Sequence, residues 1–467
     1  MLRRYGQYFA IGVFIIDIVW LMMAWGLSFE LRFYTSVLSS IGSVQAAPDL
    51  DPYLRVLVPL GIIFAAVGIN TGFYRTGRMW SLDREIRHTV RGCLLIVFVF
   101  GTFLYMAGIH RINQVFLGVF FVTLTIGLCV LRISQSILLD ILRSKGFYTR
   151  KTLLVGDGTP ARLVYERLSA NDNLGFEFVG VLTESGSAHD TVPDALGSYS
   201  DLESTLAERE ISQVLITLPA EQSHLLDSIL EKMHSLIIDI RVVPDLFKHS
   251  ILHNTNTVVE GIPMVSLNES YLSSRSLIMK RMLDVSVALA AVLIFSPVMF
   301  LVAVIIKCTS SGPVLYRQLR MGLDGQVFSM LKFRTMPVNV EADTGEVWAT
   351  EHDARPTKLG AFLRKSSLDE LPQLFNVILG HMSLVGPRPE RPVFVEDFRK
   401  KYPGYVLRHK MKAGITGWAQ VNGWRGNTSL EKRVEYDLYY IDNWSLFFDI
   451  RILLLTLRYG FIHPNAY

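Results

Sequence analysis

Two adjacent carboxylates, Asp369 and Glu370, are the residues whose type and spacing best suit catalysis. They lie in Ser367-Leu-Asp-Glu370, directly before an apolar run. Ser-x-x-Glu is the capping box of a helix N-terminus, so one interpretation is structural. The other is chemical, because an ionised carboxylate can attack phosphorus without a general base and form an acyl phosphate. Glu370 would then supply an oxygen to Mg²⁺, which binds one or two carboxylates together with substrate phosphates. The two interpretations are compatible.

Basic side chains accompany this pair. From Ile278 to the end there are 24 Lys+Arg and 17 Asp+Glu, a net charge of +7, whereas the preceding residues carry 22 and 25, or −3. A basic C-terminal part suits anionic substrates or a lipid surface. Arg388 lies between two prolines, which stiffen the backbone that presents its guanidinium. The candidate substrate-binding residues are Arg388, Pro387, Pro389, Arg364, Arg334, Lys332, Arg317 and Gln373.

The composition places this chemistry in a membrane protein. Half of the 467 residues are hydrophobic, only 19% are charged, and four apolar stretches occupy residues 8–31, 56–73, 94–109 and 115–138. Each is close to the ~20 residues that span a bilayer. Arginines and lysines gather before the first stretch, between the second and third, and after the fourth, so both ends of this part face the cytoplasm. We expect four transmembrane helices in residues 1–145. The three cysteines indicate neither a disulfide framework nor a zinc site.

Residues 146–270 have the pattern of a partial Rossmann-like, CoA-binding-like domain. A strand at 151–155 leads into Gly156-Asp-Gly158 and a helix at 162–168. A second strand at 176–182 ends near Glu184, and further strands are expected at 213–217, 238–243 and 262–267. Such a turn lets phosphate approach the N–H groups of a helix N-terminus. A scaffold or regulatory domain that has kept the turn is the alternative, and the pattern does not decide between them.

A fifth apolar run, at residues 285–306, begins the C-terminal part (residues 271–467). Ser296-Pro297 interrupts its middle, where proline kinks a helix, and Lys280, Arg281 and Lys307 flank it. A kinked span and a helix that enters the membrane and returns both fit these features. A fifth crossing would carry the basic, motif-rich remainder away from cytoplasmic nucleotides, so we expect a re-entrant helix at about 280–307. Residues 446–462 are expected to form an interfacial amphipathic or core helix.

The C-terminal part resembles the monotopic phosphoglycosyl transferases, also called bacterial sugar transferases. The resemblance runs over about 190 residues from Ile278 to Tyr467. The upstream spans and Rossmann-like segment are similar to those of the large, polytopic-looking members. The matching elements are Lys280-Arg281-x-x-Asp284, Ser296-Pro297 and Gly312-Pro313, with residues 332–336, 367–373, 383–389 and 414–420.

The resemblance implies an activity and a location. A sugar-1-phosphate would pass from a UDP-sugar to undecaprenyl phosphate in the cytoplasmic leaflet of the bacterial inner membrane, starting an exopolysaccharide, capsule or O-antigen. Asp369 would be the nucleophile of a covalent phosphosugar intermediate that releases UMP, and Glu370 would hold Mg²⁺. Arg388 would contact the uridine part. Ser296-Pro297 would shape the re-entrant helix, and Lys280 and Arg281 would anchor it near lipid headgroups.

Three alternatives concern the donor and the class of protein. The tail from Gly417 to Tyr467 is similar to glucose-1-phosphate transferases, which favours UDP-glucose, but galactose transferases are close relatives. A membrane-bound nucleotide-sugar dehydratase or epimerase would need a Tyr-x-x-x-Lys pair, and no tyrosine here has lysine four residues on. A non-enzymatic, nucleotide-sensing scaffold is the third. A second copy of the chain is a candidate partner, and nucleic acid is not expected.

Overall fold

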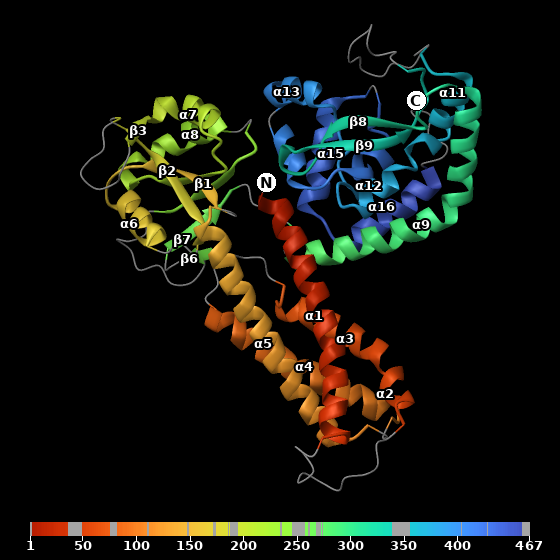
Figure 1. The fold of residues 1–467 in the computed structure, drawn as a ribbon. Helices are drawn as coiled ribbons and strands as arrows, with labels where there is room; N and C mark the ends of the chain where they lie inside the picture. Colours follow the sequence, from red (N-terminus) through yellow and green to blue (C-terminus); the bar gives the residue numbers. More distant parts are fainter. Residues whose placement is uncertain are drawn as a thin grey trace.

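The chain folds into three regions that follow one another along the sequence (Figure 1). The computed structural model describes residues 2–459 except 36–48, 75–81, 110–111, 147–148, 171–173, 185, 187–194, 234–235, 245–256, 260–261, 268–271, 273, 339–354, 403 and 427. The predicted domain boundary at 270–271 and residues 460–462 of the last predicted helix lie outside the described residues. The described chain is a mixed α/β structure.

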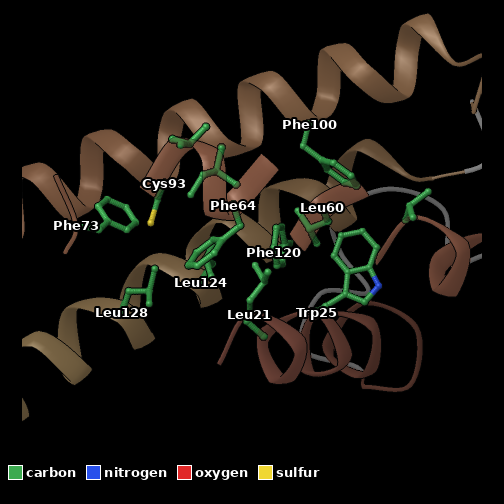
Figure 2. Close-up of a cluster of buried hydrophobic side chains, with 14 of the residues drawn as sticks. Leu21, Trp25, Leu60, Phe64, Phe73, Cys93, Phe100, Phe120, Leu124 and Leu128 are labelled. Atoms are coloured by element: carbon green, nitrogen blue, oxygen red, sulfur yellow. The ribbon is translucent and has the colours of Figure 1, made fainter. Parts of the chain in front are cut away.

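Four long apolar helices and one helix of five residues form the described part of the N-terminal region. They are α1 (Leu2–Phe33), α2 (Asp51–Arg55), α3 (Leu57–Thr71), α4 (Leu82–Met106) and α5 (Gln114–Ser144). Figure 2 shows their core, in which Trp25 lies edge-on to Phe120 near Leu21 and Leu60. Large apolar side chains such as Phe98 point outward instead. Among the described residues, five helical segments are long and apolar enough to cross a membrane. They are Ile11–Phe33, Asp51–Thr71, Glu85–Met106, Gln114–Ser144 and Arg275–Thr309.

A buried ion pair joins two of these helices. Asp17 of α1 and Arg132 of α5 are both removed from solvent, and their carboxylate and guanidinium lie 2.5 Å apart. Gln135, one turn further along α5, accepts a hydrogen bond from the same guanidinium. Breaking a buried pair leaves an uncompensated charge, so this contact fixes the register of α1 against α5.

The middle region is a seven-stranded sheet in the order β3-β2-β1-β4-β5-β7-β6. The strands from β1 to β5 are parallel, and β7 and β6 are antiparallel additions. Helices α6 (Gly158–Ser169), α7 (Leu202–Glu208) and α8 (Leu226–Met233) accompany the sheet. All five predicted strands are present, with ends that shift by one residue at most. The strands are β1 (Arg150–Gly156), β2 (Phe176–Thr183), β3 (Ala195–Ser198), β4 (Gln213–Thr217), β5 (Asp239–Val242), β6 (Thr257–Val259) and β7 (Ile262–Ser266).

Helix α9 (Ser274–Thr309) opens the C-terminal region and contains Pro297. Figure 1 shows it running along one side of this region and then turning sharply. Proline removes one backbone hydrogen bond and crowds the preceding turn, which kinks a helix. Exposed apolar side chains cover both halves, with Leu293 77% and Phe300 72% exposed. The start of α9 meets the N-terminal region, because Ile278 is buried in the same cluster as Trp25.

The rest of the C-terminal region packs against α9. Its hairpin is β8 (Leu315–Met321) and β9 (Val327–Phe333), and a short parallel pair joins β10 (Ser383–Val385) to β11 (Gly414–Thr416). The buried core includes Ala288 of α9 and Val377. The helices are α11 (Lys358–Lys365), α12 (Gln373–Ile378), α13 (Pro392–Lys401), α14 (Trp418–Val421), α15 (Leu430–Asp442) and α16 (Leu446–Tyr459).

Candidate active site

Asp369 and Glu370 lie in a single 3-10 turn, Leu368–Glu370, which ends before α12 begins at Gln373. The predicted capping box is wrong. A capping serine needs extended backbone, whereas Ser367 is left-handed (φ 54°) and its side chain makes no capping hydrogen bond. Its hydroxyl is buried without a partner in the described structure. A left-handed residue other than glycine is uncommon, and here it turns the chain so that both carboxylates face the β8–β9 hairpin.

Two cations converge on Glu370. Nζ of Lys332, on β9, donates to Oε1 of Glu370 at 2.8 Å, and Nη2 of Arg388 donates to the same oxygen at 2.9 Å. Lys332 also lies 3.8 Å from Oδ2 of Asp369. The structure therefore brings together four of the residues that the sequence singled out, from three separate segments.

The pKa values of the two carboxylates shift in opposite directions. Burial raises the pKa of Asp369, with Lys332 acting in the opposite direction. Burial also acts to raise the pKa of Glu370, but the charges of Arg388 and Lys332 outweigh it and hold that pKa well below its ordinary value. The cations thus favour the ionised form of Glu370, whereas Asp369 is a buried carboxylate without a direct hydrogen bond from either cation. Such a carboxylate is poorly solvated, and neither of the two hydrogen bonds that Glu370 accepts occupies its oxygens.

The Pro387–Pro389 loop that carries Arg388 is held through its backbone. The carbonyl of Pro387 accepts from the Gly414 N–H at 3.0 Å. That of Arg388 itself accepts from Nη2 of Arg408 at 3.2 Å, and that of Pro389 from Nη1 of Arg320 at 3.0 Å. Because three successive carbonyls are fixed, the Arg388 guanidinium is presented from a rigid base.

Sequence reasoning missed Arg408. Its guanidinium is buried, donates through Nε to Oδ2 of Asp437 at 2.8 Å, and lies over the ring of Tyr405. Burial and the charge of Arg408 together lower the pKa of the neighbouring His409 to about 3, so this imidazole is neutral at physiological pH. Nothing in the local sequence around Arg408 signals a role, because its partner lies on α15.

Arg425 is a second residue that the sequence did not single out. Burial lowers its pKa, the charge of Arg388 acts in the same direction, and Glu370 and Asp369 act in the other. These interactions associate Arg425 with the same carboxylate pair. The signal for it was present in the glycine-bounded segment Gly423-Trp-Arg-Gly426.

Two of the predicted substrate-binding residues have other surroundings. Nη1 and Nη2 of Arg334 donate to the carbonyls of Ser311 and Ser310 at 2.7 and 3.0 Å, so Arg334 caps the end of α9. Arg317 is exposed and pairs with Leu331, on the opposite face of the hairpin from Lys332. The structure does not bring Arg334 or Arg317 to the carboxylates.

The remaining predicted residues of this set lie near the carboxylates. Arg364, on α11, donates to the Thr335 hydroxyl at 3.1 Å, and its charge acts to lower the pKa of Asp369. Gln373 is buried at the first residue of α12, three positions after Glu370.

The membrane-anchoring residues also need a correction. Lys280 and Arg281 were expected near lipid headgroups, but Lys280 is 5% exposed and lies 2.8 Å from Asp449, and Arg281 donates to main-chain carbonyls of α12. Both side chains face protein because the polar acceptors around them are themselves buried. Ser296 is exposed, and its hydroxyl bonds back to Leu293 within α9.

The two carboxylates fit a magnesium ion that is also bound by substrate phosphates, but they do not form a complete metal site by themselves. Among the described residues, no three His, Cys, Asp or Glu side chains cluster as a metal site. A site with two carboxylates is what Mg²⁺ accepts when substrate phosphates and water supply its other ligands. The hydrogen bonds from Lys332 and Arg388 to Glu370 both end on Oε1, and neither of them occupies Oε2. Glu370 therefore fits as a ligand of a phosphate-bound ion.

Two family models match the chain, that of the bacterial sugar transferases over residues 275–463 and that of a CoA-binding domain over residues 70–244. The UDP-glucose:undecaprenyl-phosphate glucose-1-phosphate transferase of Escherichia coli (strain K12) is 36% identical over 427 residues, which is 89% of this chain and 90% of that protein. The enzyme of the same name from Klebsiella pneumoniae is 34% identical over 424 residues, 90% of each.

A relative with another sugar in its name matches the C-terminal region. The UDP-N-acetylgalactosamine-undecaprenyl-phosphate N-acetylgalactosaminephosphotransferase of Aeromonas hydrophila is 44% identical over 181 residues, 38% of this chain and 43% of that protein. Likeness in this region therefore does not by itself indicate one sugar.

The glycine turn of the middle region does not fit a CoA or nucleotide phosphate. The Asp157 carboxylate accepts from the Gly158 N–H at 2.7 Å, so the N-terminus of α6 already holds an anion. A Cβ at Gly156 would lie 2.3 Å from the Thr217 carbonyl oxygen, which explains that glycine by packing. Further along the same edge, Glu184 accepts from Gln222 at 2.6 Å. We assign this turn no ligand.

Proposed function

The chain belongs to the bacterial sugar transferase family, and we propose that it transfers glucose-1-phosphate from UDP-glucose to undecaprenyl phosphate, releasing UMP. The observation that carries this proposal is the 36% identity to a transferase of that name over 90% of its length, which includes all three regions of the fold. The product would start an exopolysaccharide, capsule or O-antigen.

The site supports a two-step exchange at phosphorus. An oxygen of the Asp369 carboxylate attacks the sugar-bearing phosphorus of UDP-glucose, and the bond from that phosphorus to the bridging oxygen breaks as UMP leaves. A phosphate oxygen of undecaprenyl phosphate then attacks the same phosphorus and frees the carboxylate. Neither step needs a proton to be removed from the nucleophile, which suits an aspartate without a neighbouring base.

The basic residues supply charge where the reaction develops it. Lys332 lies between the two carboxylates, and Arg388 reaches Glu370 from the other side. In this position they can hold the diphosphate of the donor and oppose the charge that grows on UMP. A magnesium ion held by Glu370 would supply Lewis-acid neutralisation of the same charge. Arg388, with Pro387 and Pro389, would contact the uridine part.

We place the C-terminal region on the cytoplasmic face of the bacterial inner membrane, with four transmembrane helices before it and α9 as a re-entrant helix. The turn of α9 in Figure 1, Pro297 within it, and the exposed apolar side chains on both of its halves support this placement. The exposed Phe447, Leu454 and Leu457 of α16 suit contact with the membrane surface.

Two measurements test the proposal. Purified protein with Mg²⁺ and undecaprenyl phosphate should release UMP from UDP-glucose and not from UDP-galactose or UDP-N-acetylgalactosamine. Release from one of the other sugars would keep the reaction and overturn the donor. A cysteine replacing Ser311, in protein whose other cysteines are removed, should react only with reagent added from the cytoplasmic side. Reaction from the opposite side would show that α9 crosses the membrane.

A further inference from the structure

The second and third turns of α9 hold two segments that carry the candidate active site. One is the carboxylate arm, residues 368–378, with Asp369 and Glu370 at its start and α12 at its end. The other is the arginine arm, residues 383–389, in which β10 leads to Arg388. The two arms touch where Arg388 bonds to Glu370. The chemistry described above makes no use of α9 in joining them.

Arg281 holds the carboxylate arm. Its Nη1 donates to the Val377 carbonyl and its Nη2 to the Ile378 carbonyl, both at 2.6 Å. These carbonyls belong to the last turn of α12, and that of Val377 also accepts from the Gly380 N–H at 2.9 Å. A planar fork that binds two carbonyls fixes both the position and the direction of the short helix. Because α12 begins three residues after Glu370, the carboxylates follow its position.

Lys280 and Asp284 hold the arginine arm. Nζ of Lys280 donates to the Val385 carbonyl at 2.9 Å. Oδ1 of Asp284 accepts from the Ser383 hydroxyl and from the Leu384 N–H, each at 3.0 Å. Lys280 and Asp284 are four residues apart and share one face of α9. Only Gly386 and Pro387 separate Val385 from Arg388.

These contacts are buried and cross-linked. The exposed fractions of the Lys280 and Asp449 side chains are 6% and 1%, and Nζ lies 2.8 Å from the carboxylate. Tyr440 donates to Oδ1 of Asp449 at 2.6 Å and lies 3.2 Å from Nζ of Lys280. A buried lysine with three fixed acceptors has lost its rotamer freedom, so it acts as a rigid connection and not as a solvated surface charge.

We propose that Lys280, Arg281 and Asp284 are positioning residues that hold Glu370 and Arg388 at bonding distance. The seating of α9 in the membrane would then set the geometry of the active site. This inference rests on the proposed function only for what the two arms do. The contacts themselves predict a change in the distance between the two arms, which can be measured without enzymatic activity.

Distances between a spin label on the carboxylate arm and a second label just after the arginine arm test the inference. Labels replace Phe375 on α12 and Val393 on α13, both exposed, in full-length protein in lipid nanodiscs with the native cysteines removed. Arg281→Gln should broaden the distance distribution and lower kcat for UMP release about ten- to hundredfold, because small misplacements of reacting groups are costly. The KM for UDP-glucose should change by less than about threefold.

A matched variant and a milder one complete the design. Arg275→Gln makes the same change on the same helix at an exposed position and should leave both readouts as in the parent. Ser383→Ala removes one hydrogen bond to Asp284 and should broaden the distribution less than Arg281→Gln, which keeps the test valid should the latter fail to fold. Unchanged distances in the folded variants would overturn the inference, even if kcat falls. Broadened distances in a protein that releases no UMP in any form would overturn the proposed function and leave the inference standing.

Discussion

Nη2 of Arg388 lies 2.9 Å from Oε1 of Glu370, and the two residues come from segments eighteen positions apart. Lys332 reaches the same oxygen from a third segment. Glu370 is therefore the point at which the carboxylate turn, the Pro387–Pro389 loop and the hairpin meet. Its neighbour Asp369 accepts neither of these hydrogen bonds, which suits the role of nucleophile that we propose for it.

Asp369→Asn should abolish UMP release, because an amide cannot form the acyl phosphate. We expect a fall of at least about a thousandfold, as is typical when a nucleophile is removed. Release of UMP in the presence of UDP-glucose and undecaprenyl phosphate is the measurement. Wild-type protein given donor alone should also gain the mass of a phosphoglucosyl group on the peptide that contains Asp369. A variant that keeps a near-native rate would contradict the covalent route.

Lys332→Gln should move the acidic limb of the pH profile of kcat/KM to higher pH. Asp369 must be ionised to attack, and burial already raises its pKa, while Lys332 opposes that shift. Loss of the cation raises the pKa further, so ionisation and activity are lost at a higher pH as the solution is acidified. Lys358→Gln, on the exposed first residue of α11, is the matched control. An acidic limb that does not move would show that Asp369 is not the titrating group.

Arg408→Lys should weaken the presentation of Arg388 without removing a positive charge. Lysine cannot donate both to Asp437 and to the Arg388 carbonyl in the geometry of a planar fork. We expect kcat/KM for UDP-glucose to fall about tenfold. Arg399→Lys, at a partly exposed position on α13, should have no such effect. Equal activity of the two variants would remove Arg408 from the positioning of the loop.

Asp17→Asn should lower the melting temperature of the protein in detergent, because it removes the charge of the nearest carboxylate to the buried Arg132 and leaves only Glu85, 3.8 Å away. Removing one partner of a buried pair costs about 3–5 kcal/mol in soluble proteins. Exchanging the two residues, Asp17→Arg with Arg132→Asp, should recover part of the loss. Thermal unfolding followed by tryptophan fluorescence checks both variants, and a single variant as stable as the parent would contradict the role given to the pair.

Local pattern predicted much of the fold. The β1 segment at Arg150–Gly156 and the β4 segment at Gln213–Thr217 are short buried runs next to turn signals, and the structure has both as strands. The strands β3 and β6 were not predicted, because segments of four and three residues at the sheet margins carry too little pattern. The bend in α9 was predictable from Pro297, because proline acts through its own ring.

The surroundings of the site residues were harder to predict. Ser367 fits a capping box by type and spacing, but its left-handed backbone depends on how the chain enters the turn. Arg334 and Lys332 lie two residues apart, yet one caps α9 and the other binds Glu370. The partners of Lys280 lie 105 residues away at Val385 and 169 residues away at Asp449. Spacing along a chain carries no information on such contacts, so charge alone suggested lipid for Lys280 and substrate for Arg334.

The sharp turn of α9 has a consequence for the bilayer itself. In the proposed placement the helix enters and leaves through one surface, and so it occupies area in one leaflet but not in the other. A wedge of this kind is accommodated most easily where lipids with large headgroups or outward curvature have already opened that leaflet. The lipids of the cytoplasmic leaflet next to the protein would therefore be under lateral strain. The shape of these lipids would influence how deeply α9 inserts.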